Sequence, residues 1–213
     1  MAGQGNPDDD PRPLAESSST LMLVLDVDDT LLKEVSIEHR ADAAVQLITY
    51  KPSPDSMLRF RQRLEARANE SVACDGNDSS KVVHYEIHGD IVKSAVVVRP
   101  SMVPIIDGLV AAGCRTLLLA SANDEPRTAA VCSELRLRPG GPTLAQIGFK
   151  AVPRTVCMAP APTRSEQKKD IAAVRAWSKA DGSCKAIILD DKHEHLVNLS
   201  SSDYLPVDCK RGE

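Results

Sequence analysis

The chain has 213 residues, of which 42% are hydrophobic and 26% are charged, the composition of a soluble globular domain. Its formal net charge of −4 and its aromatic content of 3% argue against a nucleic-acid-binding protein, because phosphate contacts need clustered Lys and Arg and unpaired bases stack on aromatic rings. No apolar run approaches the roughly 18 residues of a membrane-spanning helix. We therefore expect neither nucleic acid nor a membrane as a partner.

Residues 1–20 contain no apolar signal segment, and the acidic residues Asp8, Asp9 and Asp10 have the wrong charge for a transit peptide. We predict that this segment is a disordered tail and that residues 21–213 form one domain. The six cysteines lie far apart, without the spacing of a zinc site, which favours free thiols in a reducing compartment. These features predict an intracellular protein, either nuclear or cytoplasmic.

Short apolar runs that end in polar residues predict three buried strands, at residues 21–25, 117–119 and 186–189. Helical patterns are expected at residues 101–109, 124–135 and 163–179. In the last of these, Thr163 and Glu166 have the spacing of a capping box. The alternation predicts an α/β fold with a central, mostly parallel sheet flanked by helices. Ligands bind outside the carboxyl ends of such strands, where these polar residues fall.

The region after the first strand departs from this alternation. We expect a strand at residues 45–50, a helix at 54–70, a turn-rich linker at 74–80, and a β-hairpin formed by 81–87 and 91–98. We interpret residues 45–98 as an insertion beside the site. Residues 139–162, which are rich in Gly and Pro, predict a second, irregular insertion.

The motif that points most directly to chemistry is Asp26-x-Asp28-x-Thr30, directly after the first apolar run. Two carboxylates in one tight turn repel each other unless a cation lies between them, and Mg²⁺ prefers oxygen ligands of this kind. A carboxylate in such a site can attack phosphorus while a neighbouring acid moves protons. The alternative is a solvated acidic turn, which the polar residues at the other strand ends disfavour.

The segment LMLVLDVDDTLL resembles the first motif of the haloacid-dehalogenase phosphohydrolase superfamily. The expected hairpin, which leads into Arg99-Pro100, resembles one branch of it, the small carboxy-terminal-domain phosphatases, also called NLI-interacting-factor-like. The resemblance covers about residues 21–206. It implies a Rossmann-like fold, Mg²⁺ as the cofactor and a phosphorylated protein or peptide as the substrate.

The resemblance also implies catalytic roles for individual residues. Asp26 matches the nucleophile, and Asp28 matches the general acid and base. Thr30 matches a hydroxyl that steadies the loop. Ser121 matches a residue that binds a phosphate oxygen, although a serine here could instead cap a helix.

Lys169 resembles a lysine that neutralises phosphate charge in the transition state. Lys168 is a rival, since two neighbours on a helix point about 100° apart and only one can face the site; either could also be a surface lysine. The implied metal ligands are Asp26, Asp28 through its backbone carbonyl, Asp190 and Asp191. Within the last pair, Asp191 is expected to contact the metal and Asp190 to orient the lysine, unless both only cap a strand end.

These features predict a Mg²⁺-dependent protein serine/threonine phosphatase, a phosphoric monoester hydrolase that forms an aspartyl phosphate. The alternatives are a small-molecule phosphatase in which residues 54–80 form a cap, and a catalytically silent phosphatase-like binding module. The chain departs from the branch at Arg127-Thr128-Ala129, where an aromatic-rich Tyr-Ala-Asp stretch is normal. Few aromatic residues remain to recognise a substrate proline, so the chemistry is better supported than the substrate.

Overall fold

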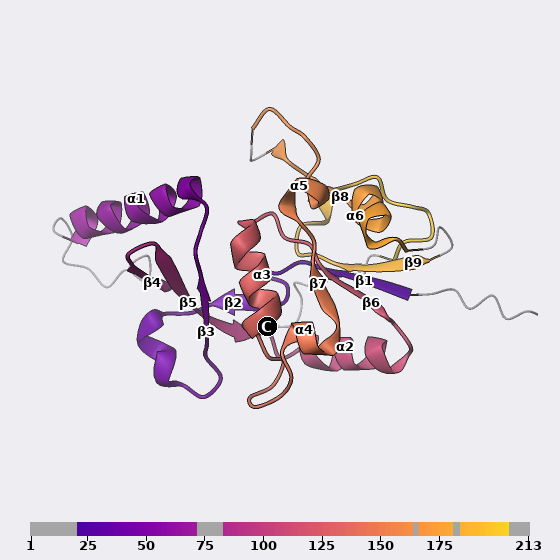
Figure 1. Ribbon diagram of the computed structural model, residues 1–213, viewed down its shortest axis with the longest axis horizontal. Helices are drawn as coiled ribbons and strands as arrows, with labels where there is room; N and C mark the ends of the chain where they lie inside the picture. Colours follow the sequence, from indigo (N-terminus) through magenta and orange to yellow (C-terminus); the bar gives the residue numbers. More distant parts are fainter. Residues whose placement is uncertain (1–20, 72–82, 164–165, 181–183, 205–213) are drawn as a thin grey trace, which may run out of the picture.

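The computed structural model describes residues 21–71, 83–163, 166–180 and 184–204 (Figure 1). The predicted tail at residues 1–20 and the predicted linker at residues 74–80 lie outside these described residues. Within them, no helix is both long enough and apolar enough to cross a membrane. The four cysteines that are described are buried free thiols, as predicted; they are Cys114, Cys132, Cys157 and Cys184.

The centre of the molecule is a four-stranded parallel sheet with the strand order β7-β6-β1-β9. Its strands are β1 (Leu21–Leu25), β6 (Thr116–Leu119), β7 (Phe149–Ala151) and β9 (Lys185–Leu189). All three predicted strands are therefore confirmed. Alternate residues of β1 enter two separate hydrophobic cores, Leu23 and Leu25 one of them and Met22 and Val24 the other. Burial on both faces explains why this strand is apolar throughout.

Helices cover both faces of this sheet (Figure 1). One face carries α2 (Met102–Ala111) and α4 (Leu144–Ile147), and the other carries α5 (Arg154–Cys157) and α6 (Ile171–Ser178). Helix α3 (Glu125–Glu134) contacts α4, β7 and a strand of a second sheet. The predicted architecture, an α/β fold with a central parallel sheet between helices, is confirmed and is compatible with a Rossmann-like fold.

The second sheet is antiparallel, with β5 paired to three other strands. Its strands are β2 (Leu32–Glu34), β3 (Gln46–Tyr50), β4 (Tyr85–His88) and β5 (Ile91–Val98). Helix α1 (Pro54–Ser71) packs against it through Phe60, whose ring contacts Tyr50 and Tyr85. The strand, helix and hairpin predicted between residues 45 and 98 are therefore present. The described residues also include the 3-10 helices η1 (Ile37–Ala41) and η4 (His193–His195).

The segment 139–162 is not the irregular insertion that its Gly and Pro content predicts. Thr143 and Gln146 form a capping box that starts α4, and Gly148 ends the helix with a φ of +113°. Strand β7 then pairs with β6 and becomes an edge of the central sheet. The prediction is wrong because a three-residue strand is too short to show a pattern of its own.

The helix predicted to start at Thr163 also begins elsewhere. The N-cap of α6 is Asp170, whose carboxylate accepts a hydrogen bond from the backbone N–H of Ala173 at 3.0 Å. The two residues before the helix form β8 (Lys169–Asp170), which pairs with β10 (Leu196–Val197). Lys169 therefore lies on a strand, and not on a helix as predicted.

Candidate functional site

Polar residues from distant parts of the chain meet at the carboxyl ends of the parallel strands, around a cavity of about 180 Å³. The backbone continues the sheet pairing to this edge, since the N–H of Asp26 donates to the carbonyl of Leu189 at 2.8 Å. The cavity is lined by Asp26, Asp28, Asp29, Ser121, Ala122, Asn123, Met158, Gln167, Lys169, Asp190, Asp191, Lys192 and His195. The cavity therefore lies beyond the carboxyl ends of the strands, where the sequence predicts the site.

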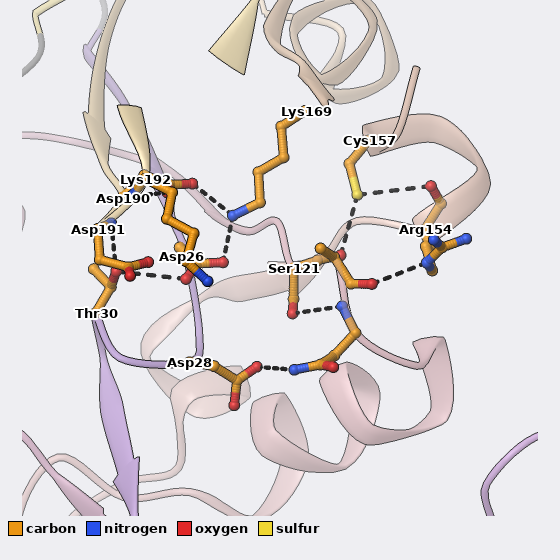
Figure 2. Close-up of polar contacts among 12 residues, drawn as sticks. Asp26, Asp28, Thr30, Ser121, Arg154, Cys157, Lys169, Asp190, Asp191 and Lys192 are labelled. Atoms are coloured by element: carbon orange, nitrogen blue, oxygen red, sulfur yellow. Dashed lines mark hydrogen bonds and ion pairs between the residues drawn. The ribbon is translucent and has the colours of Figure 1, made fainter. Parts of the chain in front are cut away.

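The turn after β1 places Asp26 at the base of the cavity, where its side chain is buried. Asp29 adopts a φ of +59°, which reverses the chain and brings Thr30 back toward the strand end. The Thr30 hydroxyl donates to Oδ2 of Asp26 at 3.4 Å and accepts from the backbone N–H of Asp191 at 3.0 Å. Thr30 thus links the loop after β1 to the loop after β9 (Figure 2).

Lys169 is the lysine that faces the site. Its side chain is buried and its Nζ donates to Oδ1 of Asp26 and, at 2.6 Å, to Oδ2 of Asp190 (Figure 2). Lys168 is exposed. Lys169 is the first residue of β8 and pairs with Leu196 of β10, whereas Lys168 lies just before this strand. Lys169 therefore faces the site, as expected, but it does so from a strand and not from the predicted helix.

Burial and the neighbouring charges shift the pKa values of Asp26, Lys169 and Asp191. Burial raises the pKa of Asp26 to about 7; Lys169 lowers this pKa and the charge of Asp190 raises it. Burial also lowers the pKa of Lys169, but the two carboxylates overcome this and hold it above its usual value. The pKa of Asp191 is raised, mainly by burial. The negative charge of the aspartates in the cavity is therefore only partly balanced by Lys169.

Three of these carboxylates could hold a metal ion. One oxygen each from Asp26, Asp190 and Asp191 lies within 4.8 Å of the others. Among the described residues, Lys169 is the one lysine that pairs with them, which leaves negative charge that a divalent cation would balance. Oxygen-only donors suit a hard cation. The donor set therefore fits a metal ion, with Asp190 also accepting from Lys169, as its expected orienting role requires.

The Asp28 carboxylate, in contrast, does not join this cluster. It accepts a hydrogen bond from the side-chain amide of Asn123 and forms an ion pair with Arg127 at 2.6 Å. Arg127 is itself buried and also pairs with Glu34 at 3.0 Å. Of the four expected metal ligands, Asp28 is thus the one whose side chain lies outside the group, leaving its backbone carbonyl as the expected donor.

Ser121 lies across the cavity from the aspartate cluster, at the end of β6 (Figure 2). Its hydroxyl is buried and accepts the backbone N–H of Asn123 at 3.1 Å. Its carbonyl accepts from the thiol of Cys157 at 3.4 Å. No described residue accepts a hydrogen bond from the Ser121 hydroxyl, so its proton remains available to a ligand oxygen.

From the sequence, Arg127 is only a departure from the pattern of the family that the chain resembles, and it has no expected role at the site. A signal was nevertheless present: Arg127 lies four residues before Val131 and eight before Leu135, so it occupies the buried stripe of α3. A buried arginine needs carboxylate partners, and here these partners are Asp28 and Glu34. Arg127 thus joins the site to the second sheet.

No family model matches the chain, and the comparisons with curated proteins and with solved structures found no match either.

Without metal, the Asp26→Asn variant is expected to gain stability relative to the wild type as the pH rises from 3.8 to about 7. In the unfolded chain Asp26 loses its proton near pH 3.8, whereas in the folded protein its pKa is about 7. The folded wild type therefore binds more protons in this window, and its free energy of unfolding falls as pH rises. Melting temperatures in EDTA test this; a pH-independent difference between the proteins would contradict it.

Proposed function

We propose that the chain is a Mg²⁺-dependent phosphatase of the haloacid-dehalogenase type, similar to the small carboxy-terminal-domain phosphatases, that hydrolyses phosphoserine and phosphothreonine in proteins. One observation carries the proposal. Asp26, Asp190 and Asp191 converge within 4.8 Å at the carboxyl ends of β1 and β9, with the ammonium group of Lys169 bonded to two of them. Such a site combines a nucleophile, a cation site and a fixed positive charge.

Mg²⁺ would be held by the carboxylates of Asp26 and Asp191 and the backbone carbonyl of Asp28, with Asp190 fixing Lys169. When bound, the ion neutralises phosphate charge and orients the phosphoryl group. Lys169 and the Ser121 hydroxyl, which both line the cavity, act on the same charge as donors to the phosphoryl oxygens that become more negative in the transition state.

In the proposed reaction, a carboxylate oxygen of Asp26 attacks phosphorus, and the bond from phosphorus to the serine or threonine oxygen breaks. Asp28, in its carboxylic acid form, gives its proton to this leaving oxygen and becomes a carboxylate. Asp28 then takes a proton from water, which attacks the aspartyl phosphate and releases inorganic phosphate and free Asp26. Asn123 and Arg127 hold the Asp28 carboxylate above the cavity, and they act as positioning residues.

An open site favours a peptide over a metabolite in this proposal. The small-molecule alternative needs part of the segment 54–80 to cover the cavity. Among its described residues, none lines this cavity, and α1 packs instead on β3 and β4 through Phe60. An extended peptide could therefore approach the strand ends. The silent-module alternative is disfavoured because the acidic residues and the lysine are all present and grouped.

The test is release of inorganic phosphate from a panel of phosphopeptides and a panel of sugar and nucleotide phosphates. With Mg²⁺, we expect phosphopeptides to be hydrolysed faster than the metabolites, and we expect EDTA to stop the reaction. Preferential hydrolysis of metabolites would support the capped alternative. No turnover of any substrate in Mg²⁺ would favour the silent binding module.

A further inference from the structure

A second cavity, of about 270 Å³, adjoins the proposed active site. It lies where α1 faces the end of β3 and the start of α3, and its lining includes Tyr50, Arg59, Phe60, Arg63 and Arg127. Asn123 lines both cavities. Arg127 lines the second one and pairs with Asp28, which lines the first. The two cavities therefore share a wall that includes Asn123.

The second cavity carries unbalanced positive charge. Arg59 and Arg63 are four residues apart on α1, so they lie on the same helix face. Arg59 donates to the hydroxyl of Ser56 at 2.7 Å, and neither arginine forms an ion pair with a described residue. The acidic residue in the lining, Asp124, is already engaged, since it accepts from the N–H and the hydroxyl of Ser53 at 2.8 and 2.9 Å.

A buried donor adds to these charges. Tyr50 is 5% exposed and lines the cavity, with its ring held against Phe60. Its hydroxyl lies near that of Ser94, but neither group completes a hydrogen bond within the described residues. Burial raises the pKa of Tyr50 to about 12, so its proton is retained at neutral pH. A buried donor without an acceptor is unfavourable and would be satisfied by an acceptor entering the cavity.

We propose that this cavity binds a second anionic group of the substrate, a carboxylate or phosphate on a residue close to the phosphoserine or phosphothreonine. The inference rests on the proposed function and names its substrate class, an acidic or multiply phosphorylated peptide. Arginine presents several N–H donors in a plane that matches the oxygens of both anions. The shared wall sets the spacing, so one peptide can place one anion in each cavity.

The experiment compares three peptides of one sequence: one phosphoserine with neutral flanks, the same peptide with glutamates on either side, and the same peptide with a second phosphoserine. For the wild type we expect kcat/KM about tenfold higher for the two anionic peptides, mainly through KM. The double variant Arg59→Gln/Arg63→Gln should reduce this ratio to about one. Which anionic peptide gives the larger ratio identifies the anion as carboxylate or phosphate.

Arg61→Gln is the matched control, because Arg61 lies between the two arginines and its exposed side chain donates instead to the carbonyl of Gly89. It should keep the tenfold preference. The inference is overturned if the wild type shows no preference for the anionic peptides, if Arg61→Gln loses this preference equally, or if the double variant keeps it.

A binding measurement separates this inference from the proposed function. Calorimetric titration of the doubly phosphorylated peptide into the protein needs no turnover. If no substrate is hydrolysed but the peptide binds, and binding weakens about tenfold in the double variant alone, the phosphatase proposal fails and the anion cavity stands. If peptides are hydrolysed without any preference for the anionic ones, the anion cavity proposal fails and the phosphatase proposal stands.

Discussion

Replacing Asp26 with asparagine is expected to abolish phosphate release while the protein stays folded. The amide keeps the shape of the carboxylate but cannot attack phosphorus, so turnover of a chromogenic phosphate ester should fall by at least about 10³-fold. The fold should tolerate the change, because it removes a charge that burial disfavours and leaves Lys169 paired with Asp190. Phosphate release with saturating Mg²⁺, together with the melting temperature, measures both effects.

Asp107→Asn is the matched control for this variant, since it is the same chemical change at an exposed residue of α2. Asp107 pairs with Arg138 and lines neither of the two cavities described above. Its turnover should equal that of the wild type. A second readout tests the covalent step: acid quenching during turnover of a substrate labelled on phosphate should leave label on the wild-type protein and none on Asp26→Asn. Equal activity of wild type and Asp26→Asn would end the proposed mechanism.

Replacing Lys169 with methionine is expected to reduce both turnover and stability. The ammonium group donates to two buried carboxylates, and its loss leaves Asp26 and Asp190 without a counter-charge. Removing one partner of a buried ion pair typically lowers the free energy of unfolding by about 3–5 kcal/mol. Loss of a donor to the transition-state charge should lower kcat by about 10²–10³-fold. Urea unfolding and steady-state kinetics measure the two effects separately.

Lys168→Met is a close control, because the two lysines are adjacent and only Lys169 is buried. Its free energy of unfolding should stay within about 0.5 kcal/mol of the wild type. The stability lost in Lys169→Met should shrink at acidic pH, where the unpaired carboxylates take up protons, and in the double variant Lys169→Met/Asp190→Asn. Comparable losses in the two single lysine variants would show that Lys169 has no special place in the site.

The elements that the sequence predicts correctly are those whose pattern follows from burial alone. Strand β1 is apolar at all five positions because both of its faces are covered, and the hairpin around Gly89 combines β-rich runs with a turn residue at a φ of +65°. The beginning of α6 was misplaced for the opposite reason. Thr163 and Glu166 match a local capping pattern, but the pairing of Lys169–Asp170 with β10 holds the chain extended up to Asp170.

The candidate site divides in the same way. The residue types and their places at strand ends follow from the sequence: Asp26, Ser121 and Asp190 each come directly after an apolar run, and parallel strands bring their carboxyl ends to one edge. The sequence does not show which residues these side chains contact. Lys169 is 143 positions from Asp26, and Arg127 is 93 positions from Glu34.

The sequence by itself therefore determined the α/β architecture, the order of the main elements and the edge of the sheet where acidic groups collect, since these depend on local periodicity and on which residues must avoid water. Only the tertiary structure decided which of two lysines faces the carboxylates. It also decided that the Asp28 side chain pairs with Arg127 outside the aspartate cluster, and that a basic cavity adjoins the proposed active site. Ion pairs and cavities arise between segments far apart in the chain, and no local pattern of residues encodes which of these segments will meet.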